Sequence, residues 1–217
     1  DYDLAWGTVT SITAWNQYEY SVDVDADRSQ LDVLALVDDN FSGDSFSQEL
    51  RLTADIGDSI EYQVGLFYYE QTTERGDRQQ DLPFPPGVSV DFLAAPGDNL
   101  VAQGKQETET LAAFGQATWH LGERWHLTGG LRWTDESKES DLFSETNSTA
   151  PSATLIGSSF LDSVSTPIDA TLERSADNVD WLLRLALDVG LDSMLFASAS
   201  TGTKSGGFNS VSGAADT

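Results

Sequence analysis

Cysteine is absent from the 217 residues, which excludes disulfide bonds and thiol chemistry. Basic residues are scarce: 11 Lys and Arg stand against 36 Asp and Glu, giving a formal net charge of −25. This balance argues against binding a nucleic-acid backbone or docking on an anionic membrane through a basic patch, because both need clustered Lys and Arg. The sequence also lacks any run of about eighteen apolar residues, so it encodes no transmembrane helix.

What the sequence does contain is strict alternation of apolar and polar residues. Between Phe46 and Ile56 the apolar residues all fall on even positions, and polar residues occupy every odd position and Gln48. After a break at 57–59, the pattern resumes from Ile60 to Tyr68. A period of two predicts strands with one apolar and one polar face, and the shared apolar side predicts a hairpin. That apolar side must contact either a protein core or lipid.

The same pattern predicts seven strands in all. Besides the hairpin, four lie near 107–121, 125–134, 179–189 and 194–204. The first strand runs from Leu4 to Val24, and its polar side is interrupted by Val9 and Trp15. Its even face carries Leu4, Trp6, Ile12, Ala14, Tyr18, Tyr20 and Val22.

The predicted connections alternate in length. Three are short turns, at Gly57–Ser59, Gly122–Arg124 and Leu191–Ser193. Three are long and polar, at approximately Asp25–Ser45, Thr73–Gln106 and Ser137–Asn178. Loops this long are uncommon in compact soluble domains, whereas alternating short turns and long loops are typical of transmembrane barrels. The pattern therefore favours lipid as the partner of the apolar face.

Aromatic residues are expected to mark the two edges of the lipid-facing band. Tyr62, Trp119 and Trp125 lie near the short turns. The opposite edge is predicted at Tyr20, Tyr68, Trp133 and Trp181. Trp125 and Trp133 would lie roughly 20 Å apart along the membrane normal, at about 3.3 Å per residue and a strand tilt of about 40°. This separation is close to the apolar band of transmembrane barrels, about 25 Å tall.

Several residues are candidates for a site. The polar face, which would line the lumen, carries five candidate contacts for a ligand or for a domain inside the barrel: Glu49, Arg51, Gln116, Arg132 and Arg184. The two histidines, His120 and His126, flank a short turn, but two ligands without a third make a poor metal site. We expect them to be hydrated residues near the mouth of the lumen.

An acidic stretch near Asp23, Asp25 and Asp27 offers the oxygen ligands that Ca²⁺ prefers. It lacks the spacing of an EF-hand loop, so a solvated acidic loop that repels anionic ligands is the favoured interpretation. No cofactor is expected. No Ser-His-Asp arrangement, phosphate-cradling loop or metalloprotease helix is present, so no enzymatic activity is predicted.

Six segments, in order along the chain, resemble barrel strands of TonB-dependent outer-membrane receptors. They are Thr10–Trp15, Phe46–Thr53, Val64–Tyr69, Ala113–Trp119, Leu127–Trp133 and Leu195–Asn209. The resemblance implies an all-β, antiparallel transmembrane barrel segment: about seven strands of a larger, 22-stranded barrel, with short periplasmic turns and long extracellular loops. Thr201 and Thr203 depart from the larger basic or aromatic residues expected at those positions.

The resemblance further implies a bacterial outer-membrane uptake receptor whose partners are membrane lipid and the TonB protein. The ligand class stays open among ferric siderophores, haem, cobalamin and glycans. Residues 1–217 would be part of a barrel domain, with the signal peptide, TonB box, plug and later strands outside this sequence, since an open sheet leaves edges unpaired in lipid. The alternatives are a passive porin-like channel and a soluble β-rich carbohydrate-binding module.

Overall fold

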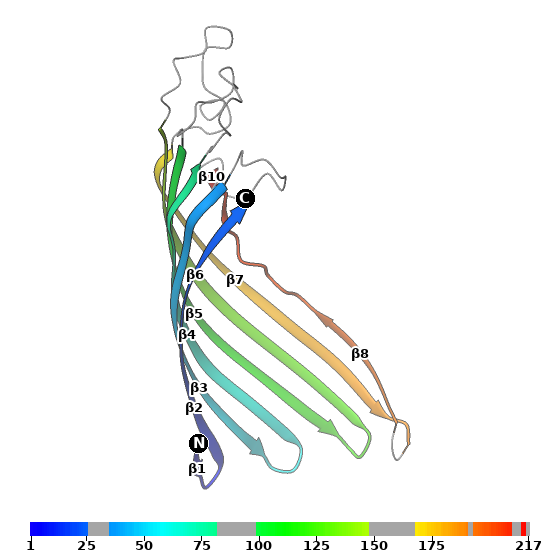
Figure 1. The fold of residues 1–217 in the computed structure, drawn as a ribbon. Helices are drawn as coiled ribbons and strands as arrows, with labels where there is room; N and C mark the ends of the chain where they lie inside the picture. Colours follow the sequence, from blue (N-terminus) through cyan, green and yellow to red (C-terminus); the bar gives the residue numbers. More distant parts are fainter. Residues whose placement is uncertain (26–34, 82–98, 148–167, 191–192, 210–213, 216–217) are drawn as a thin grey trace.

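The chain forms an open antiparallel sheet. The computed structural model describes residues 1–25, 35–81, 99–147, 168–190, 193–209 and 214–215. Strands that follow one another in sequence pair side by side from β1 to β8, and β9 pairs with β10 (Figure 1). The strands are β1 (Tyr2–Leu4), β2 (Gly7–Asp25), β3 (Ala35–Ile56), β4 (Ile60–Asp81), β5 (Asn99–Leu121), β6 (Trp125–Asn147), β7 (Ile168–Asp188), β8 (Met194–Ser200), β9 (Phe208–Asn209) and β10 (Ala214–Ala215).

No helix among the described residues is long and apolar enough to span a membrane.

The hairpin predicted from alternation is formed by β3 and β4. Leu50 lies opposite Leu66, Leu52 opposite Val64, and Ile56 opposite Ile60. Gly57 closes this turn with a φ of 61°, in the left-handed region that glycine adopts without strain. Gly122 does the same between β5 and β6, with a φ of 74°. The short turns lie together at the lower end of the sheet in Figure 1.

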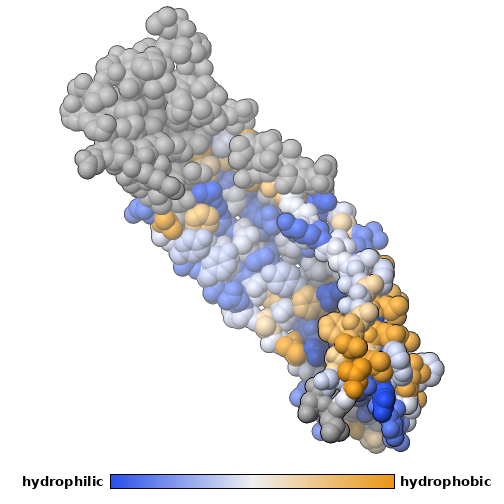
Figure 2. Space-filling model, turned by 90° about the vertical axis from the view of Figure 1, so that its right-hand side faces the viewer, coloured by the Kyte–Doolittle hydropathy of each residue, from blue (hydrophilic) through white to orange (hydrophobic). Residues whose placement is uncertain are grey.

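The sheet has two distinct faces. We call the face that carries Leu50 and Leu66 the outer face, and the face that carries Glu49 and Arg51 the inner face. On β7 the exposed and half-buried residues alternate, with the exposed ones on the outer face. Outer-face side chains that are exposed and apolar include Leu50, Leu66, Leu111, Leu131, Val179, Leu183, Leu185 and Leu195. In Figure 2 the hydrophobic surface gathers toward the lower end, with mostly hydrophilic surface above it.

Aromatic residues line both edges of the outer apolar band, and their positions follow the tilt of the strands. The upper edge is formed on β3, β4, β6 and β7, and each aromatic residue lies two residues closer to the short turns than the one before it: Phe46, Tyr68, Trp133 and Trp181. The lower edge shifts in the same way: Tyr62, Trp119 and Trp125. Tyr20, which the sequence placed in the upper belt, lies on the inner face opposite Phe41, so that assignment is wrong.

The first predicted strand needs two corrections. A turn at Ala5–Trp6 divides it into β1 and β2, which brings the main sheet to eight strands instead of about seven. The faces of β2 are also reversed. Ser11 lies opposite Leu50, so the odd residues of β2 face outward, and Ile12 lies opposite Glu49 on the inner face. The pattern misled because β2 has apolar residues on both faces.

The predicted long loops are largely strand. β3 begins at Ala35, β4 continues to Asp81, β5 begins at Asn99 and β6 continues to Asn147. Strands of 22 or 23 residues span about 70 Å, more than twice the thickness of a bilayer core. Beyond the apolar band both faces are polar, so no alternation reveals the strand, although backbone pairing continues. At the other end β8 stops at Ser200 instead of Lys204.

Candidate functional site

A hollow on the inner face contains four of the five residues predicted as contacts. Its volume is about 520 Å³, and its inner-face lining comes from five neighbouring strands, β3 to β7, together with β8. The lining side chains are Glu49, Arg51, Gln63, Phe114, Gln116, Arg132, Asp180, Leu182 and Ser200. Arg184 lies on the same face but two rows nearer the short turns, opposite Thr128. The predicted role of these five residues in binding stays a prediction.

Glu49 and Arg51 form an ion pair along β3. The residues are two positions apart, so both side chains lie on one face of the strand. Nε of Arg51 donates to Oε1 of Glu49 at 2.9 Å, and a second guanidinium nitrogen contacts the same oxygen. The charge of Arg51 is therefore already compensated. Because both side chains remain partly exposed, such a pair contributes only about 0–1 kcal/mol to stability.

Arg132 has a different environment. Its guanidinium carbon lies 5.6 Å from the ring centroid of Phe67 and 5.7 Å from that of Phe114, within cation–π range. Its Nε donates to Oγ1 of Thr134 at 3.3 Å. Asp180 lies directly opposite on β7, but its carboxylate accepts hydrogen bonds from the backbone nitrogen and hydroxyl of Thr203. Within the described residues, Arg132 has no carboxylate partner.

Arg184 also contacts an aromatic ring instead of an acid. Its guanidinium carbon lies 4.8 Å from the ring centroid of Phe196 on β8. Its Nε is buried without a hydrogen-bond partner. Gln116 is exposed beside Gly130, whose missing side chain leaves the wall open at that point. Arg184 and Gln116 both lie on the inner face, as the alternation of their strands predicted.

The two histidines form the centre of a polar chain across four strands. Nδ1 of His120 lies 2.7 Å from Nδ1 of His126, and Nε2 of His126 lies 2.8 Å from Oδ2 of Asp188. Nε2 of His120 is 3.1 Å from Oε1 of Glu61, an ion-pair distance without hydrogen-bond geometry. Both rings are about three-quarters buried (side-chain exposure 28% and 26%). The expectation of separate hydrated histidines is therefore wrong.

No cluster of three or more His, Cys, Asp or Glu suited to a metal ion occurs in the part of the chain that the structure describes. Of the acidic candidates for calcium, Asp23 lies on β2 and Asp25 ends that strand. Asp27 falls outside the described residues.

Charged residues are sorted between the two faces. Among strand residues with described side chains, only one basic residue lies on the outer face, Lys105. The others lie on the inner face: Arg51, Arg75, Arg132, Lys138, Arg174 and Arg184. The outer face beyond the apolar band is acidic, with Glu19, Asp44, Glu70, Glu74, Glu107, Glu109, Asp135, Glu139, Asp141, Asp169, Glu173 and Asp177.

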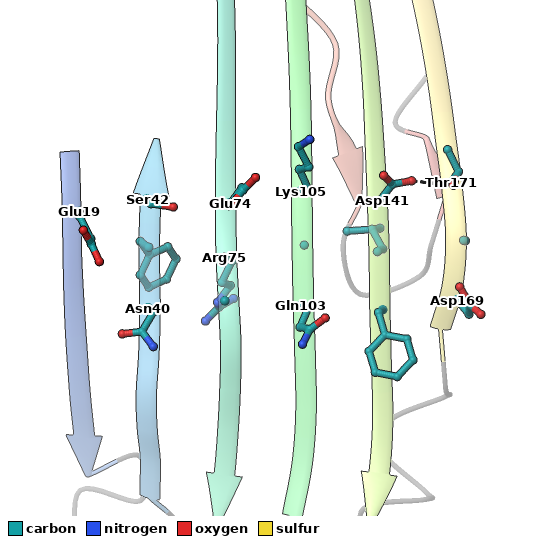
Figure 3. Close-up of a pocket in the computed structure, with 16 residues that line it drawn as sticks. Glu19, Asn40, Ser42, Glu74, Arg75, Gln103, Lys105, Asp141, Asp169 and Thr171 are labelled. Carbon is teal, nitrogen blue, oxygen red and sulfur yellow. Dashed lines mark hydrogen bonds between the residues drawn. The ribbon is translucent and has the colours of Figure 1, made fainter. Parts of the chain in front are cut away.

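Figure 3 shows part of this acidic surface, a hollow of about 460 Å³ with Glu19, Glu74, Asp141 and Asp169 around Lys105. Nζ of Lys105 lies 2.6 Å from Oε1 of Glu107. This hydrogen bond and the charge of Glu107 raise the pKa of Lys105 above its ordinary value. The lysine is therefore paired with Glu107 on its own strand, and the other acids around the hollow outnumber it.

Comparison with known proteins identifies the fold. A family model described as "TonB dependent receptor-like, beta-barrel" matches residues 1–216. The chain belongs to the TonB-dependent receptor family. The family is one of outer-membrane transport receptors, so the outer face of this receptor segment faces lipid where it is apolar. The open eight-stranded sheet is a part of such a barrel.

Individual relatives agree with the family. The receptor segment is 33% identical over 91 residues to the pesticin receptors of Yersinia enterocolitica and Yersinia pestis, covering 41% of this chain and 11% of theirs. The ferric yersiniabactin uptake receptor from Yersinia pestis has the same fold, with a TM-score of 0.74 at 20% identity. That match covers 99% of this chain and 29% of the solved one, so the segment spans under a third of these relatives.

Sequence reasoning missed the aromatic residues around Arg132. Phe114 is an apolar residue on the otherwise polar face of β5, so the alternation gives it no role. Its signal lies on the neighbouring strand, where Gly65 stands directly opposite Phe114. The Phe114 ring lies over this glycine so closely that a Cβ there would be 2.4 Å from its Cζ. A glycine opposite an inward aromatic residue was the available sign of a packed site.

Proposed function

We propose that the protein containing this segment is an outer-membrane receptor that binds a ferric siderophore and imports it into the periplasm with energy delivered by TonB. Residues 1–217 would be part of its barrel domain. The names of the relatives support a siderophore: one is described as a ferric yersiniabactin uptake receptor and two as pesticin receptors. Haem, cobalamin and glycans remain the competing nutrients.

The observation that carries this proposal is the placement of the scarce cations of a very acidic chain on its inner face. The net charge is −25, yet all but one of the strand cations with described side chains face inward. Acids such as Glu49, Glu136 and Asp180 share this face, and the cations offset their negative charge. The inner face therefore repels an anionic ligand less than the acidic outer face does. Aromatic rings lie among these cations, and Phe67 stacks on Tyr69 with centroids 6.4 Å apart. A flat, negatively charged ferric chelate fits such a wall better than a neutral glycan does.

The test uses the full-length protein in the outer membrane of cells that lack other siderophore receptors. Uptake of radiolabelled iron is measured for a ferric phenolate chelate, a ferric hydroxamate chelate and haem. Cobalamin and a maltodextrin, each with its own radiolabel, are the further ligands. We expect saturable uptake of a ferric chelate that stops when the proton-motive force is dissipated or TonB is deleted. Preference for haem, cobalamin or maltodextrin over every ferric chelate would refute the proposed ligand class.

The passive channel is the main rival. A porin-like pore would admit small solutes in proportion to their concentration, and an uncoupler would leave that uptake unchanged. Conductance of the full-length protein in planar bilayers adds a second criterion. A large, constantly open conductance supports the channel, whereas a closed barrel supports the receptor.

A further inference from the structure

The inner-face cations of the membrane-spanning region differ in whether an acid compensates them. Arg51 is paired with Glu49 on its own strand. Further up the wall, Nζ of Lys138 lies 3.4 Å from Oε1 of Glu136 and also donates to the carbonyl of Gly206 at 2.8 Å. Arg132 has no acidic partner within the described residues, although a carboxylate stands directly opposite it. Arg132 is therefore the cation of the hollow that makes no ion pair.

One cross-strand row builds the surroundings of Arg132. Arg51, Gly65, Phe114, Arg132 and Asp180 lie directly opposite one another on β3, β4, β5, β6 and β7. Gly65 gives the Phe114 ring room to lie flat on β4, and the ring in turn faces the guanidinium. Asp180 is held by Thr203 from the segment after β8. The row thus turns Arg132 away from its neighbouring acid and toward the aromatic rings.

Two phenylalanines and one threonine restrain the guanidinium without neutralising it. Phe67 and Phe114 contribute cation–π contacts, and Thr134 accepts the Nε hydrogen bond. A guanidinium has five N–H donors in a planar fork, so the terminal nitrogens of Arg132 stay available for a bidentate oxyanion. A half-buried cation is stabilised by an opposite charge more strongly than an exposed cation is, because less water screens it.

We propose that Arg132 binds a carboxylate or phenolate oxygen of the transported ligand in the hollow of about 520 Å³. This inference rests on the proposed uptake function and narrows its ligand class to anions with a flat ring. The volume lies within the range of small-molecule sites, about 300–1,000 Å³. Gln63 and Gln116 add amide donors and acceptors to the lining, and the Phe114 ring in the lining offers a surface for the flat part of the ligand.

The experiment measures Kd with the full-length receptor in detergent, by calorimetry. The probes are the ferric complex of a phenolate chelator that carries one free carboxylate and the methyl ester of the same complex. The variants are R132Q, which removes the charge, and R132K, which keeps the charge but loses the fork. R184Q is the matched control, because Arg184 carries the same charge against a phenylalanine ring on the inner face but does not line the hollow.

We expect R132Q to weaken binding of the free acid about 10- to 100-fold, the range for hydrogen bonds to a charged group. R132K should fall between R132Q and the unmodified receptor, and R184Q should change Kd less than about threefold. The methyl ester should bind more weakly than the acid and respond little to R132Q. A loss of affinity that is equal for acid and ester would overturn the proposal, since it indicates a general structural effect.

Two further results separate this inference from the proposed function. If the unmodified receptor binds neither phenolate probe, the inference fails, and the uptake assay decides whether the proposed function stands with another ferric chelate. If it binds both probes and R132Q changes neither Kd, uptake of a ferric chelate stands and the role of Arg132 is refuted. Thermal unfolding of each variant completes the test. A lower Tm for R132Q with unchanged Kd would mean that the acid partner of Arg132 belongs to the protein itself, which also overturns the inference.

Discussion

Leu182 and Leu183 are neighbours on β7 that face opposite sides of the sheet, so they test which side contacts lipid. Leu183 lies on the outer face in the middle of the apolar band and is 52% exposed. Leu182 is half-buried on the inner face, where it lines the hollow. The two residues have the same side chain and the same strand, so the same substitution at each position differs only in its surroundings.

Replacing Leu183 with arginine places a charge near the bilayer midplane, which costs about 2–4 kcal/mol in transmembrane barrels. That is a factor of about 30 to 1,000 in the folding equilibrium. At Leu182 an arginine can extend into the polar hollow, so we expect L182R to cost under about 1.5 kcal/mol. The leucine truncations L183A and L182A measure the packing that each site loses without any added charge.

The assay is equilibrium unfolding of the full-length receptor in lipid vesicles, with tryptophan fluorescence as the signal and denaturant as the variable. At each site, the free energy of unfolding of the arginine variant is compared with that of the alanine variant. The membrane assignment of the two faces would be refuted if L182R cost as much as L183R. It would also be refuted if L183R and L183A unfolded at the same denaturant concentration.

The remaining predictions concern other parts of the sheet. S11R should destabilise the receptor by about 1–3 kcal/mol, because Ser11 faces lipid. I12R should destabilise it by less, because Ile12 lies opposite Glu49 on the inner face. The reverse order would restore the assignment of the β2 faces made from sequence. G65A should cost about 1–3 kcal/mol in denaturant unfolding, because its Cβ would overlap the Phe114 ring; no change would show that the ring moves freely. H126A should leave His120 and Asp188 without their partner, at a cost of about 1–3 kcal/mol, and amides near 120–126 should exchange faster in deuterium-exchange mass spectrometry. Unchanged exchange there would contradict a role for the chain of polar contacts.

The part of the fold that faces lipid was predictable from sequence, because lipid imposes a period of two on the strands that cross it. The register of β3 and β4 follows from their alternation and the turn at Gly57. The faces of β2 were not predictable in this way. Its inner face carries Ile12, Tyr18 and Tyr20, and an apolar residue that faces the interior gives the same signal as one that faces lipid. Only the register with β3 decides between them.

The candidate site was predictable in its charges but not in its contacts. Alternation alone places Arg132 and Arg51 on the inner face. Whether each has a partner depends on neighbours from other strands, which the sequence does not specify. Arg51 pairs within its own strand, whereas Arg132 depends on Phe67, Phe114 and the segment that holds Asp180. The contact between His120 and His126 was not predictable for the same reason, because it depends on the register of β5 with β6.

The sorting of charge between the faces gives the receptor a preferred direction of approach. A ligand anion that nears the outer wall above the membrane meets carboxylates such as Glu70, Glu107 and Glu139 and is repelled. The same anion moving along the inner face meets arginines as well as acids, so it is repelled less. The total charge of the chain therefore says little about what it attracts, since the sign that a solute experiences depends on its route. Because the charges on the outer wall are exposed, added salt should weaken its repulsion of anions.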